Sequence, residues 1–188
     1  LAQRCSVDTR DGDISPQPVN DQQPEGKENA LAKVGRLRLL LDLWGVVHIT
    51  AEVYEEAVTF GHAMGAPDAL TIRLFCQKHN LPIITVAGDV LAAYHPPIKL
   101  DPGEHAIFAH ARTLKDVLAL VDDEDARTEG RRLGIPVRGT VGILVEAYRR
   151  ALLKLPEIEF LLNELSARPD IWISSKLCEQ VLRSLRSE

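Results

Sequence analysis

Short apolar runs alternate with helix-patterned segments from residue 30 onward. Four runs have the length and apolar content of buried strands: residues 46–49, 81–86, 117–121 and 135–137. Segments with apolar residues at helical spacing lie between and after them. This alternation favours parallel strands, because a parallel connection needs a crossover helix, and helices then cover both faces of the sheet. The sequence therefore predicts an α/β fold.

The first two helical segments have defined apolar faces. The first is predicted as one helix that Gly45 ends, with a buried face of Leu31, Val34, Leu37 and Leu41. Thr50 can cap the second, whose inner face is expected to hold Val53, Ala57 and Phe60.

The first 29 residues differ from the rest of the chain. They are polar, rich in proline and glycine and without period, which indicates an irregular, possibly disordered segment ahead of one domain over residues 30–188. Residues 5–9 are an exception, because Cys-Ser-Val-Asp-Thr can form a short strand.

The bulk composition limits the class of protein. Three widely spaced cysteines without a metal-binding pattern suit a reducing compartment and predict a cytoplasmic protein. No apolar run is long enough for a membrane span. The net charge of −5 excludes a basic footprint over the whole surface. It does not exclude an enzyme that acts on nucleic acid through metal ions, because acidic ligands make such a site negative.

Three acidic motifs are candidates for chemistry. Asp101-Pro102-Gly103-Glu104 is a capping box, and a carboxylate in the first turn of a helix can also face a metal. Asp122 and Asp123 follow an apolar run. One of them would serve as a helix N-cap, whereas two exceed what a single cap needs, so a metal role is predicted for Asp123 with Asp122 as its competitor.

The third motif is Glu55-Glu56, in the helix predicted after Thr50. Helical spacing places Glu56 beside the apolar stripe of that helix and turns Glu55 toward water. On pattern alone, Glu56 is a solvated flank.

The ordered set of motifs resembles a PIN domain of the VapC-like ribonuclease group, from about Leu31 to the C-terminus. The matching pieces are Leu31-Ala32-Lys33-Val34-Gly35-Arg36-Leu37, Val53-Tyr54-Glu55-Glu56, Leu100-Asp101-Pro102-Gly103-Glu104, Asp122-Asp123 with Ala126-Arg127, and Gly139-Thr140-Val141-Gly142-Ile143-Leu144. The resemblance implies a three-layer α/β/α sandwich with a mostly parallel sheet. It also implies an acidic pocket that binds Mg²⁺ or Mn²⁺ and hydrolyses RNA.

Carried over by position, Glu56, Glu104 and Asp123 are the implied catalytic and metal-binding carboxylates, with Asp122 as a possible substitute for Asp123. The chain departs from the family at its start, where an apolar strand ending in Asp-Thr or Asp-Ser usually precedes the Leu-Ala-Lys helix. Here Val7-Asp8-Thr9 resembles that piece but lies some twenty residues too early. Either Asp8 still reaches the pocket as a metal ligand, or the first acidic ligand is lost.

Two functions follow from the resemblance. The first is a metal-dependent ribonuclease, the toxin-like component of a toxin–antitoxin pair, with RNA as substrate, an antitoxin as partner and a homodimer as its assembly. The second is a catalytically inactive PIN scaffold that binds a protein or RNA. An unrelated α/β protein with well-capped helices is the third reading. A local basic rim for RNA is also a hypothesis, with candidates Arg127, Arg131 and Arg132, or Arg149, Arg150 and Lys154.

Overall fold

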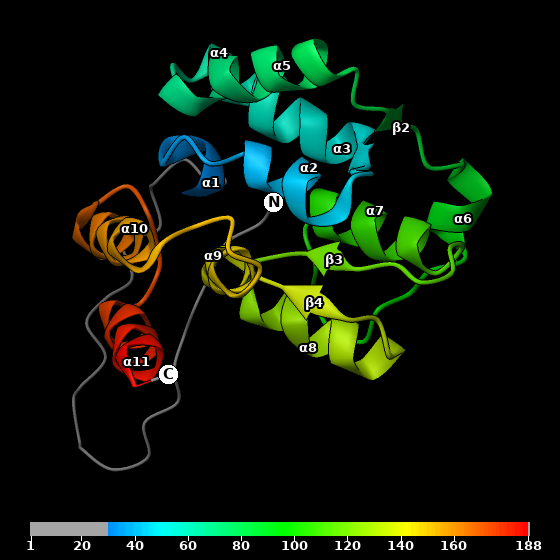
Figure 1. Ribbon diagram of the computed structural model, residues 1–188. Coiled ribbons are helices and arrows are strands. Elements are labelled where there is room, and N and C mark those ends of the chain that lie inside the picture. Colours follow the sequence, from blue (N-terminus) through cyan, green and yellow to red (C-terminus); the bar gives the residue numbers. More distant parts are fainter. Residues whose placement is uncertain (1–29, 188) are drawn as a thin grey trace, which may run out of the picture.

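The computed structural model describes residues 30–187 and shows helices that alternate with short parallel strands (Figure 1). The first half contains α1 (Ala30–Lys33), α2 (Arg38–Trp44), β1 (Ile49–Thr50), α3 (Ala51–Tyr54), the π-helical segment η1 (Glu55–Phe60), α4 (Gly61–Ala63), α5 (Pro67–His79), β2 (Ile83–Ile84) and α6 (Gly88–Ala92). The second half contains α7 (Pro102–Ala111), β3 (Ala119–Leu120), α8 (Glu124–Leu133), β4 (Val137–Arg138), α9 (Thr140–Arg149), α10 (Leu155–Ala167) and α11 (Ser175–Arg186). The predicted α/β class is confirmed.

The described strands form two separate parallel pairs. β1 pairs with β2, with Ile49 opposite Ile83, and β3 pairs with β4, with Ala119 opposite Val137. In Figure 1, α3–α5 lie on one side of β3 and β4, and α8 lies on the other. Helix α7 packs against both β1 and β3 and so links the two pairs.

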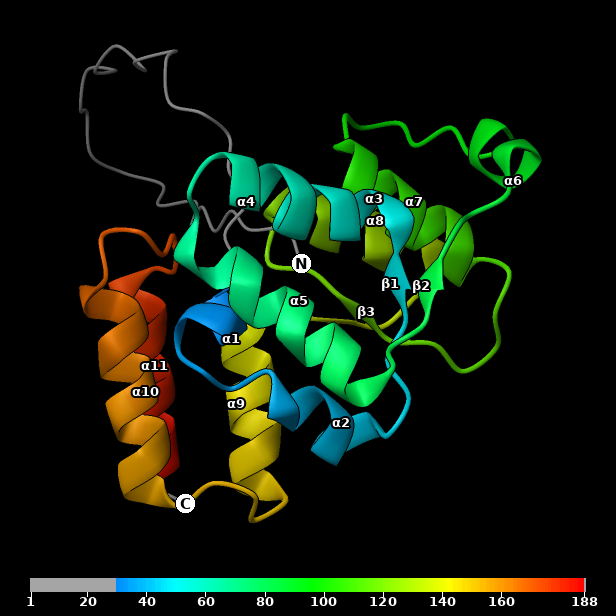
Figure 2. The same ribbon diagram turned by 90° about the horizontal axis from the view of Figure 1, so that it is seen from above.

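Two apolar clusters hold these elements together. The larger cluster joins α1, α2 and α9 to the α10–α11 hairpin, and its fully buried side chains include Leu31, Ile143 and Leu162. Figures 1 and 2 both show α10 and α11 side by side at one end of the molecule. The smaller cluster surrounds Phe108 of α7 and includes Val121, at the end of the β3 run. The candidate acidic residues after β3 therefore follow a buried segment.

The first predicted helix is interrupted. Gly35 adopts a φ of +65°, which ends α1, and α2 begins only at Arg38. A positive φ is accessible to glycine without steric cost, so the break follows from the residue type. The leucines Leu31 and Leu37 are nevertheless buried as predicted.

The predicted apolar face of the second helix is wrong at Phe60, which is 62% exposed. Residues 55–60 form a π-helical segment, in which hydrogen bonds span five residues and each turn holds more residues than in an α-helix. The wider turn moves Phe60 off the inner face and places Val58 there, with 5% exposure. The predicted strand at residues 46–49 is also displaced, because β1 is Ile49–Thr50.

Candidate acidic site

Glu56 lies on η1, where the acidic pair Glu55-Glu56 forms its first turn. Glu55 is exposed and Glu56 is half-buried, so the predicted orientation of the two side chains is confirmed. π-helical turns occur frequently at functional sites. The π-helical turn therefore supports Glu56 as a candidate functional residue.

Glu104 lies in the first turn of α7 and is almost fully buried. The Glu104 backbone N–H donates to Asp101 Oδ1 at 2.8 Å, and the Asp101 N–H donates to Glu104 Oε2 at 3.2 Å. The predicted capping box is thereby confirmed. It fixes the direction of the Glu104 side chain at the beginning of the helix.

The carboxylate of Glu56 lies against this same first turn of α7. A β-carbon added to Gly103 would lie 3.0 Å from Glu56 Oε2 and 3.2 Å from Val53 Cγ2. Because glycine has no side chain, the Glu56 carboxylate of η1 can lie directly beside Gly103. The structure thus places the carboxylate of Glu56 beside Gly103, the residue that precedes Glu104.

Asp122 and Asp123 each cap a different helix. Asp123 is the N-cap of α8, and its Oδ1 accepts hydrogen bonds from the N–H groups of Asp125 and Ala126 at 2.8 and 3.0 Å. Asp122 binds the first residue of α9, since its Oδ1 accepts from Thr140 N at 2.7 Å and its Oδ2 from Thr140 Oγ1 at 2.6 Å. Two aspartates are present because two helices begin here: Asp123 accepts hydrogen bonds at the start of α8, and Asp122 accepts them at the start of α9.

The Asp122 network is buried. Asp122 is 5% exposed and Thr140 is fully buried, and Arg127 Nη2 lies 3.7 Å from Asp122 Oδ1. Burial raises the pKa of the Asp122 carboxyl, while the hydrogen bonds from Thr140 and the charge of Arg127 offset part of that rise. A β-carbon at Gly139 would lie 2.5 Å from Asp122 Oδ1, so the backbone passes directly beside the carboxylate.

A family model described as "PIN domain" matches residues 29–187, almost the whole chain. The chain belongs to the PIN-domain family. Searches of curated proteins and of solved structures found no match to it. Membership indicates a nuclease-like protein that binds nucleic acid, and PIN domains generally use divalent metal ions.

The part of this PIN domain that the structure describes does not by itself form a metal site. Within residues 30–187, no group of three or more histidine, cysteine, aspartate or glutamate side chains is close enough to hold an ion. Asp8, the remaining predicted ligand, lies outside the described residues. Glu56, Glu104 and Asp123 therefore do not come together as a metal site within residues 30–187.

The sequence analysis did not single out Glu129, a further buried carboxylate of the PIN domain. Glu129 on α8 is 1% exposed, accepts a hydrogen bond from Tyr94 Oη at 2.6 Å and is paired with Arg132. The Arg132 guanidinium holds the pKa of Glu129 below its usual range. Since Glu129 is satisfied by these partners, it joins α8 to the segment after α6 and has a structural role. Its position on the buried face of α8, beside Ala126 and Gly130, was the available signal.

The proposed basic rim on α8 is paired with carboxylates in this structure. Arg131 Nη2 lies 2.8 Å from Glu124 Oε1, and Arg127 lies near both Asp122 and Glu124. On the other candidate segment, Arg150 binds Glu146 and the carbonyl oxygen of Leu43. These partners favour a structural role for the arginines.

None of the described helices is long and apolar enough to cross a membrane.

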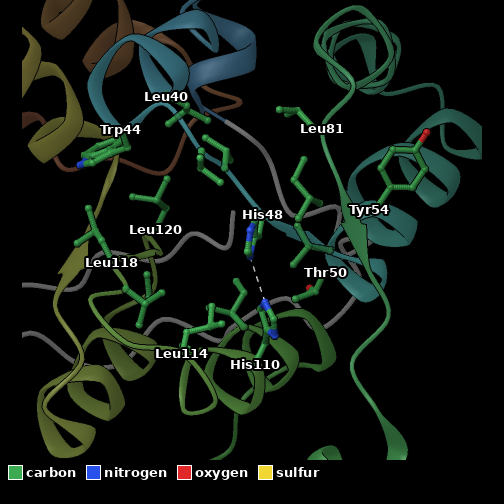
Figure 3. Close-up of a pocket in the computed structure, with 18 of the residues that line it drawn as sticks. Leu40, Trp44, His48, Thr50, Tyr54, Leu81, His110, Leu114, Leu118 and Leu120 are labelled. Carbon is green, nitrogen blue, oxygen red and sulfur yellow. Dashed lines mark hydrogen bonds between the residues drawn. The ribbon is translucent and has the colours of Figure 1, made fainter.

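A cavity of about 490 Å³ lies between the two strand pairs, and we name it the interstrand cavity. Residues of β1, β3, α2, α5 and α7 line it (Figure 3). His48 and His110 point toward each other across it, with Nδ1 of His48 3.2 Å from Nε2 of His110. Burial, followed by the charge of His48, lowers the pKa of His110.

The lowered pKa of His110 predicts that acid destabilises the fold. As the pH falls below the usual histidine value of 6.5, His110 binds a proton in the unfolded chain while it stays neutral in the folded protein. The free energy of unfolding should therefore fall as the pH drops through 6.5 and below. Chemical denaturation across this range should show a smaller decrease for His110→Gln. The exposed His62 provides the control, and a wild-type pH dependence in His110→Gln would contradict the assignment.

Proposed function

We propose that this PIN domain is a metal-dependent ribonuclease that hydrolyses RNA phosphodiester bonds, with Glu56, Glu104 and Asp123 as its acidic residues in the described part. The observation that carries the proposal is the approach of the Glu56 carboxylate to the first turn of α7, next to Glu104. The Glu56 carboxylate is not needed to cap α7, because the Asp101–Glu104 pair already provides the cap.

Mg²⁺ or Mn²⁺ fits this set by ligand type, since both ions prefer carboxylate oxygens. The two capping bonds of Asp123 both go to Oδ1, which leaves its second oxygen to serve as a ligand. Asp122 engages both of its oxygens with Thr140, so we assign the ligand role to Asp123 rather than Asp122. When bound, such an ion lowers the pKa of an attacking water and stabilises charge on the leaving oxygen.

Calorimetric titration of the full chain with Mn²⁺ tests the proposal. The wild-type chain should bind Mn²⁺, and Asp123→Asn should weaken binding at least about tenfold. Asparagine caps a helix as well as aspartate does, so α8 should remain intact. Asp125→Asn is the matched control, because Asp125 is exposed on the same helix and its charge loss should leave binding unchanged. Equal weakening by both substitutions would indicate a diffuse charge effect.

The alternative function is an inactive PIN scaffold that binds RNA or a protein. It is favoured by one observation, that residues 30–187 do not bring three metal ligands together. No Mn²⁺ binding at millimolar concentration, combined with retained RNA binding, would support the scaffold. Mn²⁺ binding that requires Asp123 would support the ribonuclease.

We further propose a cytoplasmic toxin-like protein that pairs with an antitoxin and forms a homodimer. The support for an apolar interface is a group of exposed side chains on η1, directly after α4 and on α5: Phe60, Met64, Leu70 and Leu74. Exposed apolar groups of this kind mark protein interfaces when they are contiguous. Light scattering of the full chain gives its mass and thus its assembly.

A further inference from the structure

Two histidines from separate elements meet at some distance from the acidic residues. His48 stands directly before β1, and His110 lies in the last turn of α7. Nδ1 of His48 lies 3.2 Å from Nε2 of His110, and the two side chains point toward each other (Figure 3). His110 follows Glu104 by six positions of the same helix, a rise of roughly 9 Å. The histidine pair is therefore separate from the candidate acidic site.

The separation of the two facing nitrogens suits two ligands of one metal ion. Zn²⁺ binds imidazole nitrogens at about 2.0–2.1 Å in a tetrahedral arrangement, which places two such nitrogens roughly 3.3 Å apart. The ring planes of His48 and His110 are inclined by 37°. Because His48 is exposed, its ring can turn toward a shared ion, and the ion can enter from solvent.

The protonation state of the pair also suits metal binding. As a hydrogen-bonded pair, the facing nitrogens share one hydrogen, which one ring donates to the other. Burial, followed by the charge of His48, lowers the pKa of His110, so His110 is neutral near pH 7. In a neutral pair the donor ring needs only to carry its hydrogen on its other nitrogen. Both facing nitrogens then present lone pairs, and an ion binds between them without net release of a proton.

The interstrand cavity beside the pair has space for the remaining ligands of an ion. Within residues 30–187, no third histidine, cysteine, aspartate or glutamate completes the pair, so water must fill the other positions. The cavity of about 490 Å³ has room for several waters. Thr50 lines the same cavity, and its hydroxyl oxygen is buried without a hydrogen-bond partner among the described residues. A water bound to the ion would give this hydroxyl a partner.

We propose that His48 and His110 bind a transition-metal ion that prefers imidazole ligands, with Zn²⁺ as the ion. Imidazole suits Zn²⁺, whereas Mg²⁺ and Mn²⁺ prefer oxygen ligands, so this site and the acidic residues select different ions. The ion links the residue before β1 to the end of α7, a helix that also packs against β3. With two protein ligands the site is an open, stabilising clamp that binds more weakly than a four-ligand structural zinc site. The site does not depend on the proposed ribonuclease function.

Zn²⁺ titration of the full chain at about pH 7.5, where imidazole is mostly neutral, tests the site. Calorimetry should show binding by wild type, and thermal unfolding should shift to higher temperature as Zn²⁺ is added, because the ion binds the folded state. His48→Gln and His110→Gln should each weaken the binding at least about tenfold and remove the shift. His62→Gln is the matched control, because His62 is exposed on α4 and should not contribute.

Four results would overturn the proposal. They are no Zn²⁺ binding by wild type, binding that survives substitution of either histidine of the pair, an equal loss in His62→Gln, and a loss in Asp123→Asn. The last result would assign the ion to the acidic residues. A chain that binds Zn²⁺ through the pair but fails to bind Mn²⁺ would count only against the proposed ribonuclease.

A measurement on wild type alone covers the case in which a substitution unfolds the chain. Diethyl pyrocarbonate modifies accessible imidazoles, and mass spectrometry locates the modified residues. Saturating Zn²⁺ should slow the modification of His48 at least about tenfold and leave that of His62 unchanged. Equal protection of the two residues, or none at His48, would overturn the site.

Discussion

Replacing Asp122 with alanine should lower the free energy of unfolding by about 3 to 5 kcal/mol. The substitution removes the acceptor of two short hydrogen bonds and leaves the N–H and hydroxyl of fully buried Thr140 without a partner. It also leaves Arg127 facing the vacated space. Chemical denaturation with an unchanged denaturant slope measures the loss.

A series at adjacent positions shows whether the buried bonds cause this effect. Asp122→Asn should lose about 1 kcal/mol or less, because the amide can accept from Thr140 N–H and donate to its hydroxyl. Asp123→Ala should lose about 1 kcal/mol, the usual value of an N-cap. A loss in Asp122→Ala no larger than in Asp123→Ala would contradict the assignment of the network.

The charge of Asp122 has a separate signature. Burial raises its pKa, so the folded protein keeps the proton to a higher pH than the unfolded chain does. Wild type should therefore lose stability relative to Asp122→Asn as the pH rises above the usual aspartate value of 3.8.

Glu56→Gln should reduce metal-dependent RNA cleavage about 100-fold or more, if the proposed function holds. The substitution keeps the size of the side chain against Gly103 and removes the charge that would hold an ion or accept a proton from water. The rate of cleavage in Mn²⁺, with a substrate that wild type cleaves, is the measurement.

The neighbouring residue offers the matched control for Glu56. Glu55→Gln makes the same chemical change one position earlier in η1, on a side chain that is exposed. It should leave the cleavage rate within about twofold of wild type, as expected for a surface substitution away from the site. Equal losses in the two variants would show that the negative charge of η1 acts only at long range.

The sequence predicted features whose cause lies within a few residues. The Asp101–Glu104 capping box spans one helical turn, so four consecutive residues are enough to identify it. The different exposure of Glu55 and Glu56 follows from helical spacing. Phe60 was placed on the wrong face, because a 3.6-residue period cannot reveal a π-helical turn that packing imposes.

Contacts between distant segments were beyond pattern reasoning. The bond from Thr140 to Asp122 joins residues 18 positions apart, across α8 and β4, and explains why two aspartates stand side by side. The space that Gly103 leaves for Glu56 also depends on how α3 and η1 dock on α7. The helix break at Gly35 could have been predicted from the sequence, since glycine readily adopts a positive φ.

The shared capping point of α8 and α9 sets the electric field at the edge of the sheet. Each helix has ten residues, and each N-terminus carries roughly half a positive charge. The two helix ends together offset about one of the two charges that Asp122 and Asp123 could carry. A cation beside the pair would therefore be attracted by about one net negative charge rather than two.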